Sequence, residues 1–106
     1  MDSTLELNEL RERIRQAPLM LIAGRIRRAR RTAGVDGLLL SHDQFGALAG
    51  GLTRQHLIKL EKGKHRPGPE MLLRISEASG RSVDWFLDPE VDPSPFPDGE
   101  GANGDG

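Results

Sequence analysis

The sequence contains no cysteine, and this absence excludes several kinds of chemistry. A disulfide, a thiol nucleophile and a cysteine-ligated metal site are all impossible, and the chain fits a reducing compartment. No apolar run approaches the roughly 20 residues that a membrane helix needs. The N-terminus, MDSTLELNEL, is acidic and lacks the basic and apolar regions of a signal peptide. We therefore expect a soluble, cytoplasmic protein without a membrane partner.

Groups suited to catalysis or metal binding are sparse. The histidines His42, His56 and His65 lie at no spacing typical of metal ligands, and no carboxylate cluster accompanies them. No combination of serine, histidine and acid has support beyond composition. We predict that the protein is not an enzyme and holds neither a metal ion nor a cofactor.

Charge is distributed unevenly along the 106 residues. Residues 1–18 carry a net charge of −1, residues 19–87 hold twelve Lys/Arg and six Asp/Glu, and residues 88–106 hold six acids and no base. A basic body beside an acidic tail indicates a polyanionic partner for the body, the alternative being an ordinary solvated surface.

The two ends of the chain differ from its middle. Residues 88–106, rich in Pro, Gly and Asp, cannot bury enough apolar surface to offset their ordering entropy, so we predict a disordered tail. It either keeps the protein soluble or folds back on the basic face and competes with the polyanion. Residues 1–18 begin with Ser3 and Glu6 at capping-box spacing. We expect an amphipathic helix there, packed on the body or on a second subunit, or else a frayed arm.

The body, residues 19–87, has the signals of five helices and no strand of useful length, which predicts an all-α fold. Ser41, Thr53 and Ser82 stand at N-cap positions, and Gly50, Gly51, Gly63 and Gly80 stand at helix ends. The predicted helices span about 19–33, 42–49, 54–62, 69–79 and 83–87.

Hydrophobic spacing identifies the residues expected in the core. On the first helix of the body the apolar residues should point inward and the arginines outward. Within 42–49, either Phe45 with Gly46 or Gly46 with Ala47 faces inward, and we favour the first because it buries Phe45. The other predicted inward residues are Leu19, Ile22, Ile26, Ala29, Leu72, Leu73, Ile75, Met71 or Ala78, Trp85 and Phe86.

Residues 42–62 have the layout of a helix-turn-helix, in which the second helix lays its N-terminal residues along the DNA major groove. Leu57 and Leu60, three apart, can pack on the first helix, and Leu52 can anchor the turn. Arginine can bind guanine and glutamine can bind adenine, each through two hydrogen bonds. The base-reading candidates are Thr53, Arg54, Gln55, His56 and Lys59; Ile58 either touches a thymine methyl or fills the core.

A second set of residues is expected to bind phosphates without reading sequence. It combines polar residues at the start of helix 42–49 with the basic turn after helix 54–62, since helix N-termini and cations both attract phosphate. The phosphate-contacting candidates are Ser41, His42, Gln44, Lys62, Lys64, His65 and Arg66.

The stretch LTRQHLIKLEKGKHRPGPEMLLRISEASGRSVDWFL resembles the second half of an Xre/Cro-type helix-turn-helix domain, the kind found in lambdoid phage repressors. That family's pattern appears here without a gap as Glu61, Gly63, Pro67, Leu72, Leu73, Ile75, Gly80, Ser82, Val83 and Asp84. The resemblance covers about residues 19–87. It implies a compact five-helix domain that binds double-stranded DNA, usually as a repressor and often as a homodimer.

The resemblance also implies roles for single residues. Arg54, Gln55 and Lys59 fall on base-facing positions, and Lys62 falls on a phosphate-contacting one. Glu61 corresponds to a glutamate that pairs with a first-helix arginine, for which Arg30 is the best match. The chain departs from the family at His42, where a glutamine is usual, with Gln44 two residues further on. It departs again in the connector VDGLLL, about five residues longer than usual, whose leucines either cover the core or form a contact surface.

We therefore expect a sequence-specific DNA-binding transcriptional regulator that reads its operator through residues 53–62. The alternative is an antitoxin-type protein that binds a partner such as a toxin and represses its own operon. In that case VDGLLL and the N-terminal helix would form the partner surface. A third reading, a helix-turn-helix adaptor without DNA binding, is disfavoured because an adaptor has no need of a strongly basic body.

Overall fold

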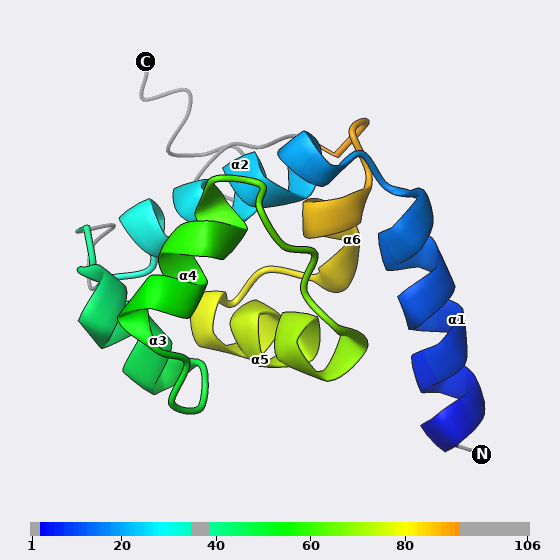
Figure 1. The fold of residues 1–106 in the computed structure, drawn as a ribbon, viewed down its shortest axis with the longest axis horizontal. Coiled ribbons are helices and arrows are strands. Elements are labelled where there is room, and N and C mark those ends of the chain that lie inside the picture. The colour runs from blue at the N-terminus through cyan, green and yellow to red at the C-terminus, as the bar shows by residue number, and fades with distance from the viewer. Residues whose placement is uncertain (1–2, 35–38, 92–106) are drawn as a thin grey trace.

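The computed structural model describes residues 3–34 and 39–91, which fold into helices without any strand (Figure 1). The helices are α1 (Ser3–Gln16), α2 (Leu19–Thr32), α3 (His42–Leu48), α4 (Arg54–Glu61), α5 (Pro69–Ser79) and α6 (Val83–Leu87). The predicted all-α class is confirmed, with five helices following an N-terminal one. α5 and α6 have the predicted bounds, and α2, α3 and α4 each end one residue earlier than predicted.

Short polar side chains fix where three helices begin. Ser41 and Gln44 form a reciprocal capping box at the start of α3, with the Gln44 N–H donating to Ser41 Oγ (3.1 Å). Thr53 Oγ1 accepts from the backbone N–H of His56, and Ser82 accepts from that of Trp85. These are the caps that the sequence predicted. Glycines with positive φ follow α3, α4 and α5, at Gly50, Gly51, Gly63 and Gly80.

The core lies where α2 meets α4, α5 and α6, with α3 completing it from the side of α4 and α5. Phe45 is fully buried and Ala47 is exposed, so the register that buries Phe45 with Gly46 is confirmed. Trp85 packs edge to face on Phe86, with ring centroids 5.0 Å apart. The largest fully buried side chains are Phe45, Phe86, Ile22, Ile26, Leu57, Leu60, Leu72 and Ile75.

Two assignments of helix faces were wrong. Leu73 is 39% exposed, because α5 buries Leu72 and Ile75, and Leu73 lies on the flank of that stripe. Arg25 of α2 points inward, and its side chain lies over the ring of Trp85 with Cζ 5.4 Å from the centroid. The cation is stabilised there by the aromatic face and by a hydrogen bond to the Trp85 carbonyl oxygen.

α1 packs against its own chain. Ile14 is 3% exposed, and α1 lies beside α5, while its N-terminal end points away from the body (Figure 1). Arg66 Nη1 donates to the carbonyl oxygens of Ile14 and Ala17, both at 2.7 Å. Arg13 pairs with Asp84 at 2.6 Å near the start of α6. Of the expected alternatives for this segment, packing on the body is the one that the structure shows.

The segments flanking the body are partly described. In the connector VDGLLL, Leu40 packs against the core and Leu39 is 58% exposed, while residues 35–38 lie outside the described residues. Val91 also packs against the core, so the body continues four residues past the predicted boundary at Leu87. The predicted disorder of residues 92–106 lies outside the described residues. None of the described helices has the length and apolarity to cross a membrane.

Candidate nucleic-acid interface

The turn between α3 and α4 is held by a close backbone approach. The N–H groups of Gly51 and Leu52 both donate to the carbonyl oxygen of Gly46, at 3.0 and 2.9 Å. In the other direction, the Leu52 carbonyl oxygen would lie only 2.1 Å from a Cβ atom built on Gly46. Only glycine fits at position 46 with this turn in place. The turn thereby sets the angle between the two helices.

α4 buries one side and displays the other. Leu57 and Leu60 are 0% and 1% exposed, as predicted. The opposite side carries the base-reading candidates: Thr53, Arg54, Gln55 and Lys59 are exposed and His56 is half-buried. Ile58 is half-buried too, and it lines a hollow beside the helix. The structure thus brings the five candidates together on one helical surface.

The cations of this surface are not neutralised within the described residues. The ion pairs among the described residues involve Arg13, Arg15, Arg30 and His42. None of them involves Arg54, Lys59, Lys62 or Lys64. Of the acids that the structure describes, Glu61 is the one on α4. Its side chain is 6% exposed and already pairs with Arg30. The exposed face of α4 therefore presents positive charge to solvent.

A buried ion pair joins α4 to α2. Arg30 Nε lies 2.7 Å from Glu61 Oε2 and Arg30 Nη2 lies 3.1 Å from Oε1, with side-chain exposures of 9% and 6%. Arg30 Nη1 also donates to the Leu40 carbonyl oxygen at 2.8 Å. His42 Nε2 lies 3.3 Å from Glu61 Oε1. Together these contacts join α2 and α3 to the carboxylate of Glu61 on α4.

The hollow beside this pair has a volume of about 330 Å³. Arg27 and Lys62 line it together with Arg30, His42 and Glu61, and Ile58 supplies an apolar wall. Apart from Glu61, every polar side chain in the lining is a cation or a histidine. The hollow is therefore suited to an anion beside the exposed face of α4.

Residues 38–86 match a family model described as helix-turn-helix, which covers α3 to α6. This segment is a helix-turn-helix domain of the Xre/Cro type. No curated protein and no solved structure matches the chain. Over residues 38–86 the chain therefore resembles DNA-binding regulators of the Xre family.

Within the helix-turn-helix domain, the phosphate candidates occupy different settings. Lys62, Lys64 and His65 are exposed next to α4, and the His65 ring lies edge to face with that of His56, 6.1 Å between centroids. Ser41 and Gln44 are exposed but engaged in their capping box. His42 faces Glu61, and Arg66 is hydrogen-bonded to the end of α1. Arg66 therefore has a structural role that sequence reasoning missed.

Sequence reasoning also missed residues on α2, outside the matched segment. Arg27 lines the hollow beside α4, and no spacing rule connected it with residues some thirty positions away. Arg81, which lies between α5 and α6, was missed as well, and its Cζ lies 4.8 Å from the Trp85 ring centroid. Burial, and then the nearby charge of Arg28, lowers the pKa of Arg81 below its usual range. The available signal was that α2 holds five arginines and no acid.

Proposed function

We propose that the protein is a sequence-specific transcriptional repressor that binds operator DNA as a homodimer, with α4 in the major groove. The observation that supports this most is the exposed side of α4, whose cations form no ion pair with other described residues and which the glycine turn holds at a fixed angle. A dimer of such domains would read two half-sites about 34–36 Å apart.

Each exposed residue of α4 has a chemical role in this proposal. Arg54 donates two hydrogen bonds to a guanine, and Gln55 pairs with an adenine in the same way. Both stand in the first turn of α4, the part of a recognition helix that reaches base edges. Lys59, one turn further, contacts a base or the sugar–phosphate edge of the groove. Thr53 and His56 contact bases beside them.

Phosphate contacts would flank the base-reading residues. Lys62, Lys64 and His65 project from the end of α4 and the turn after it, so they can hold one DNA strand. Ser41, His42 and Gln44 lie at the start of α3, where the backbone of the other strand would pass. These contacts position the domain and give binding that falls steeply with salt.

A protein-binding role is the second candidate, favoured by Leu39. This leucine of the connector is 58% exposed although it is large and apolar. An antitoxin-type protein would use such a side chain against its partner. Co-purification of a toxin-like chain, lost in a Leu39→Ser variant, would support this function, and DNA binding alone would not.

The first test is binding of the purified protein to the DNA upstream of its own gene, titrated with salt and random competitor DNA. Tight binding that resists competitor is expected for a specific regulator. Weak binding that any DNA removes equally would contradict the proposal. Reporter expression from the same promoter, with and without the protein, then distinguishes a repressor from an activator.

Substitutions on α4 and in the following turn should have different consequences. Arg54→Ala should cost about 1–3 kcal/mol of discrimination at one base pair, because it removes a two-bond contact to a base. Lys64→Ala should weaken operator and random DNA by the same factor and lower the salt slope by about one. Titration of both variants against operators substituted at each position checks this. Equal behaviour of the two would mean that α4 is not the reading helix.

A further inference from the structure

The outer face of α2 carries charges that have no ion-pair partner in the part of the chain that the structure describes. Two of its five arginines are accounted for: Arg25 packs on Trp85 and Arg30 pairs with Glu61. Arg27, Arg28 and Arg31 are exposed, and none forms an ion pair among the described residues. We call these three residues the arginine face.

The arginine face surrounds a second hollow of about 530 Å³, lined by its three arginines, Gly24 and Thr32. Gly24 forms its floor, and a Cβ atom built there would meet nothing within 4 Å. No acid contributes to the lining. The hollow is therefore open, positively charged and large enough for a phosphate with its neighbouring sugars.

This arrangement is unfavourable for the isolated helix. Arg27 and Arg31 are four residues apart and Arg28 and Arg31 are three apart, so the like charges face each other on adjacent turns. The helix dipole favours cations in the last turn, which helps Arg31 but not Arg27 or Arg28. The arginine face thus weakens α2, and an anionic ligand would reverse that effect.

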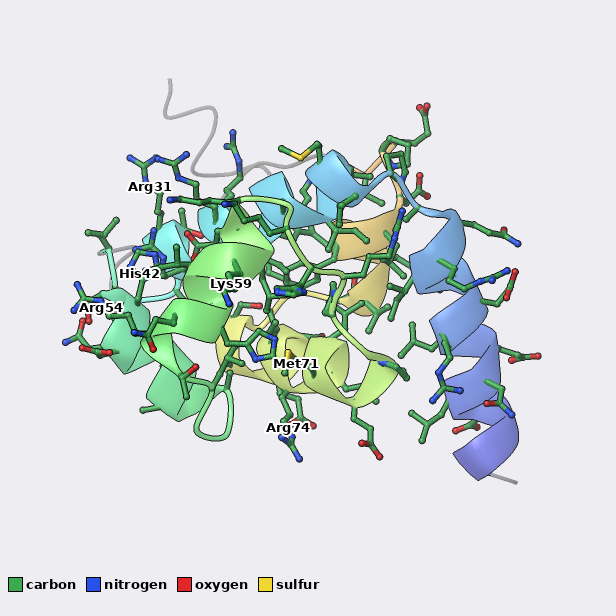
Figure 2. The ribbon with its side chains drawn as sticks, in the orientation of Figure 1. Arg31, His42, Arg54, Lys59, Met71 and Arg74 are labelled. Atoms are coloured by element: carbon green, nitrogen blue, oxygen red, sulfur yellow. The ribbon has the colours of Figure 1, made fainter. Side chains whose placement is uncertain are left out.

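The arginine face adjoins the exposed face of α4 that we propose reads the bases. Arg27 lines this hollow and also the 330 Å³ hollow that contains Lys62 of the α4 C-terminus. Figure 2 shows Arg31, His42 and Arg54, from α2, α3 and α4, along the same edge of the molecule. A DNA strand that passes the end of α4 would therefore run on toward α2.

We propose that Arg27 and Arg31 bind backbone phosphates of the operator outside the base pairs read by α4, with Arg28 adding positive charge at the far rim. This inference rests on the proposed function, since it extends the same interface. The ligand is a phosphodiester chain held without regard to sequence. The α2 contacts would lengthen the DNA footprint beyond that of the matched segment, residues 38–86.

The first experiment compares two double variants that lose the same charge. Arg27→Ala with Arg31→Ala should lower the slope of log affinity against log salt by about 1.8 and weaken operator and random DNA by an equal factor. Arg11→Ala with Arg15→Ala removes two exposed arginines from α1, on the opposite side of the molecule, and should leave the slope unchanged. Circular dichroism checks that both variants fold.

The second experiment fills the hollow. Gly24→Glu and Gly24→Gln should both raise the melting temperature, because each replaces a helical glycine by a better helix former with room for its side chain. A carboxylate at position 24 also lies three and four residues before Arg27 and Arg28, the spacing of favourable pairs. The glutamate variant should then bind DNA several-fold more weakly than the glutamine variant, which has a side chain of the same size without the charge. A fold that gains stability while losing affinity separates a binding role from a structural one.

Contrary outcomes are distinct from failure of the proposed function. An unchanged salt slope in the α2 double variant, with specificity still lost in Arg54→Ala, would overturn the inference and leave the recognition helix in place. Tighter DNA binding by the α2 double variant would also overturn it. The arginine face would then hold an acidic segment, such as residues 92–106 with four acids and no base, that competes with DNA. If no variant, Arg54→Ala included, lost any DNA binding, the proposed function itself would be contradicted.

Discussion

Replacing Glu61 with alanine is expected to destabilise the protein by about 3–5 kcal/mol, the usual cost of removing one partner of a buried ion pair. The substitution leaves the Arg30 side chain, 9% exposed, without the two carboxylate oxygens that accept hydrogen bonds from its Nε and Nη2. It also removes the group that His42 faces across 3.3 Å. Small domains have about 5–15 kcal/mol of stability in total, so much of this one could unfold. Urea denaturation followed by circular dichroism measures the loss.

A double variant identifies the cause. Arg30→Met with Glu61→Leu replaces both charges by apolar side chains and should recover most of the lost stability, because no buried charge is then left unpaired. Asp84→Ala is a matched control, since it also removes one carboxylate from an arginine pair. The Arg13–Asp84 pair has side-chain exposures of 50% and 62%, and its loss should cost less than about 1 kcal/mol. A similar small cost for Glu61→Ala would show that water reaches the buried pair.

The sequence was most informative where structure is local. Ser41, Thr53 and Ser82 cap helices because a side-chain oxygen reaches the N–H group three residues further on, which depends on little else. Glycine likewise occurs at the helix ends because its own φ angle is positive there, which other residues rarely adopt. For this reason the helix bounds and the α3–α4 turn could be read from neighbouring residues, with errors of one residue at C-terminal ends that fray.

Contacts between distant residues were predicted less well. Arg25 is inward because Trp85, sixty positions later, offers its ring and its carbonyl oxygen. Arg66 binds carbonyl oxygens of α1 because the turn after α4 passes beside that helix. Periodicity assigns an arginine to solvent in both cases, since it counts charge and spacing but not what lies across the fold. The Arg30–Glu61 pair was anticipated through a family resemblance rather than through periodicity.

The candidate interface likewise has one part that local sequence predicts and one part that depends on contacts between distant residues. The residues of α4 were found from the sequence because a single amphipathic helix determines which of them are outward. The arginine face of α2 was not, since its relation to α4 depends on the packing of two helices about thirty residues apart. Arg27 lines both the hollow beside α4 and the hollow on α2, and this shared residue is visible only in the folded chain.

Replacing Gly46 with alanine is expected to lower the free energy of unfolding by about 3 kcal/mol. The same substitution should also abolish operator binding. The new methyl group would lie 2.1 Å from the Leu52 carbonyl oxygen, against an ordinary contact distance of about 3.5 Å. The obstructing atom belongs to the backbone, so no side-chain rotation relieves the overlap, and overpacking of this kind typically costs 1–3 kcal/mol. Relief requires α3 and the turn to separate, which breaks the hydrogen bonds from Gly51 and Leu52 to Gly46.

Gly24→Ala provides the matched control, because it makes the same change inside a helix where nothing lies within 4 Å. It should stabilise the protein by about 0.5–1 kcal/mol. Measured at a temperature where both variants are folded, operator affinity should fall far more for Gly46→Ala than for Gly24→Ala, since in the Gly46 variant α4 can no longer keep its angle to α3. If Gly46→Ala bound the operator normally while folded, the turn geometry would not control recognition. The α4 side chains would then have to find the groove by adjusting during binding.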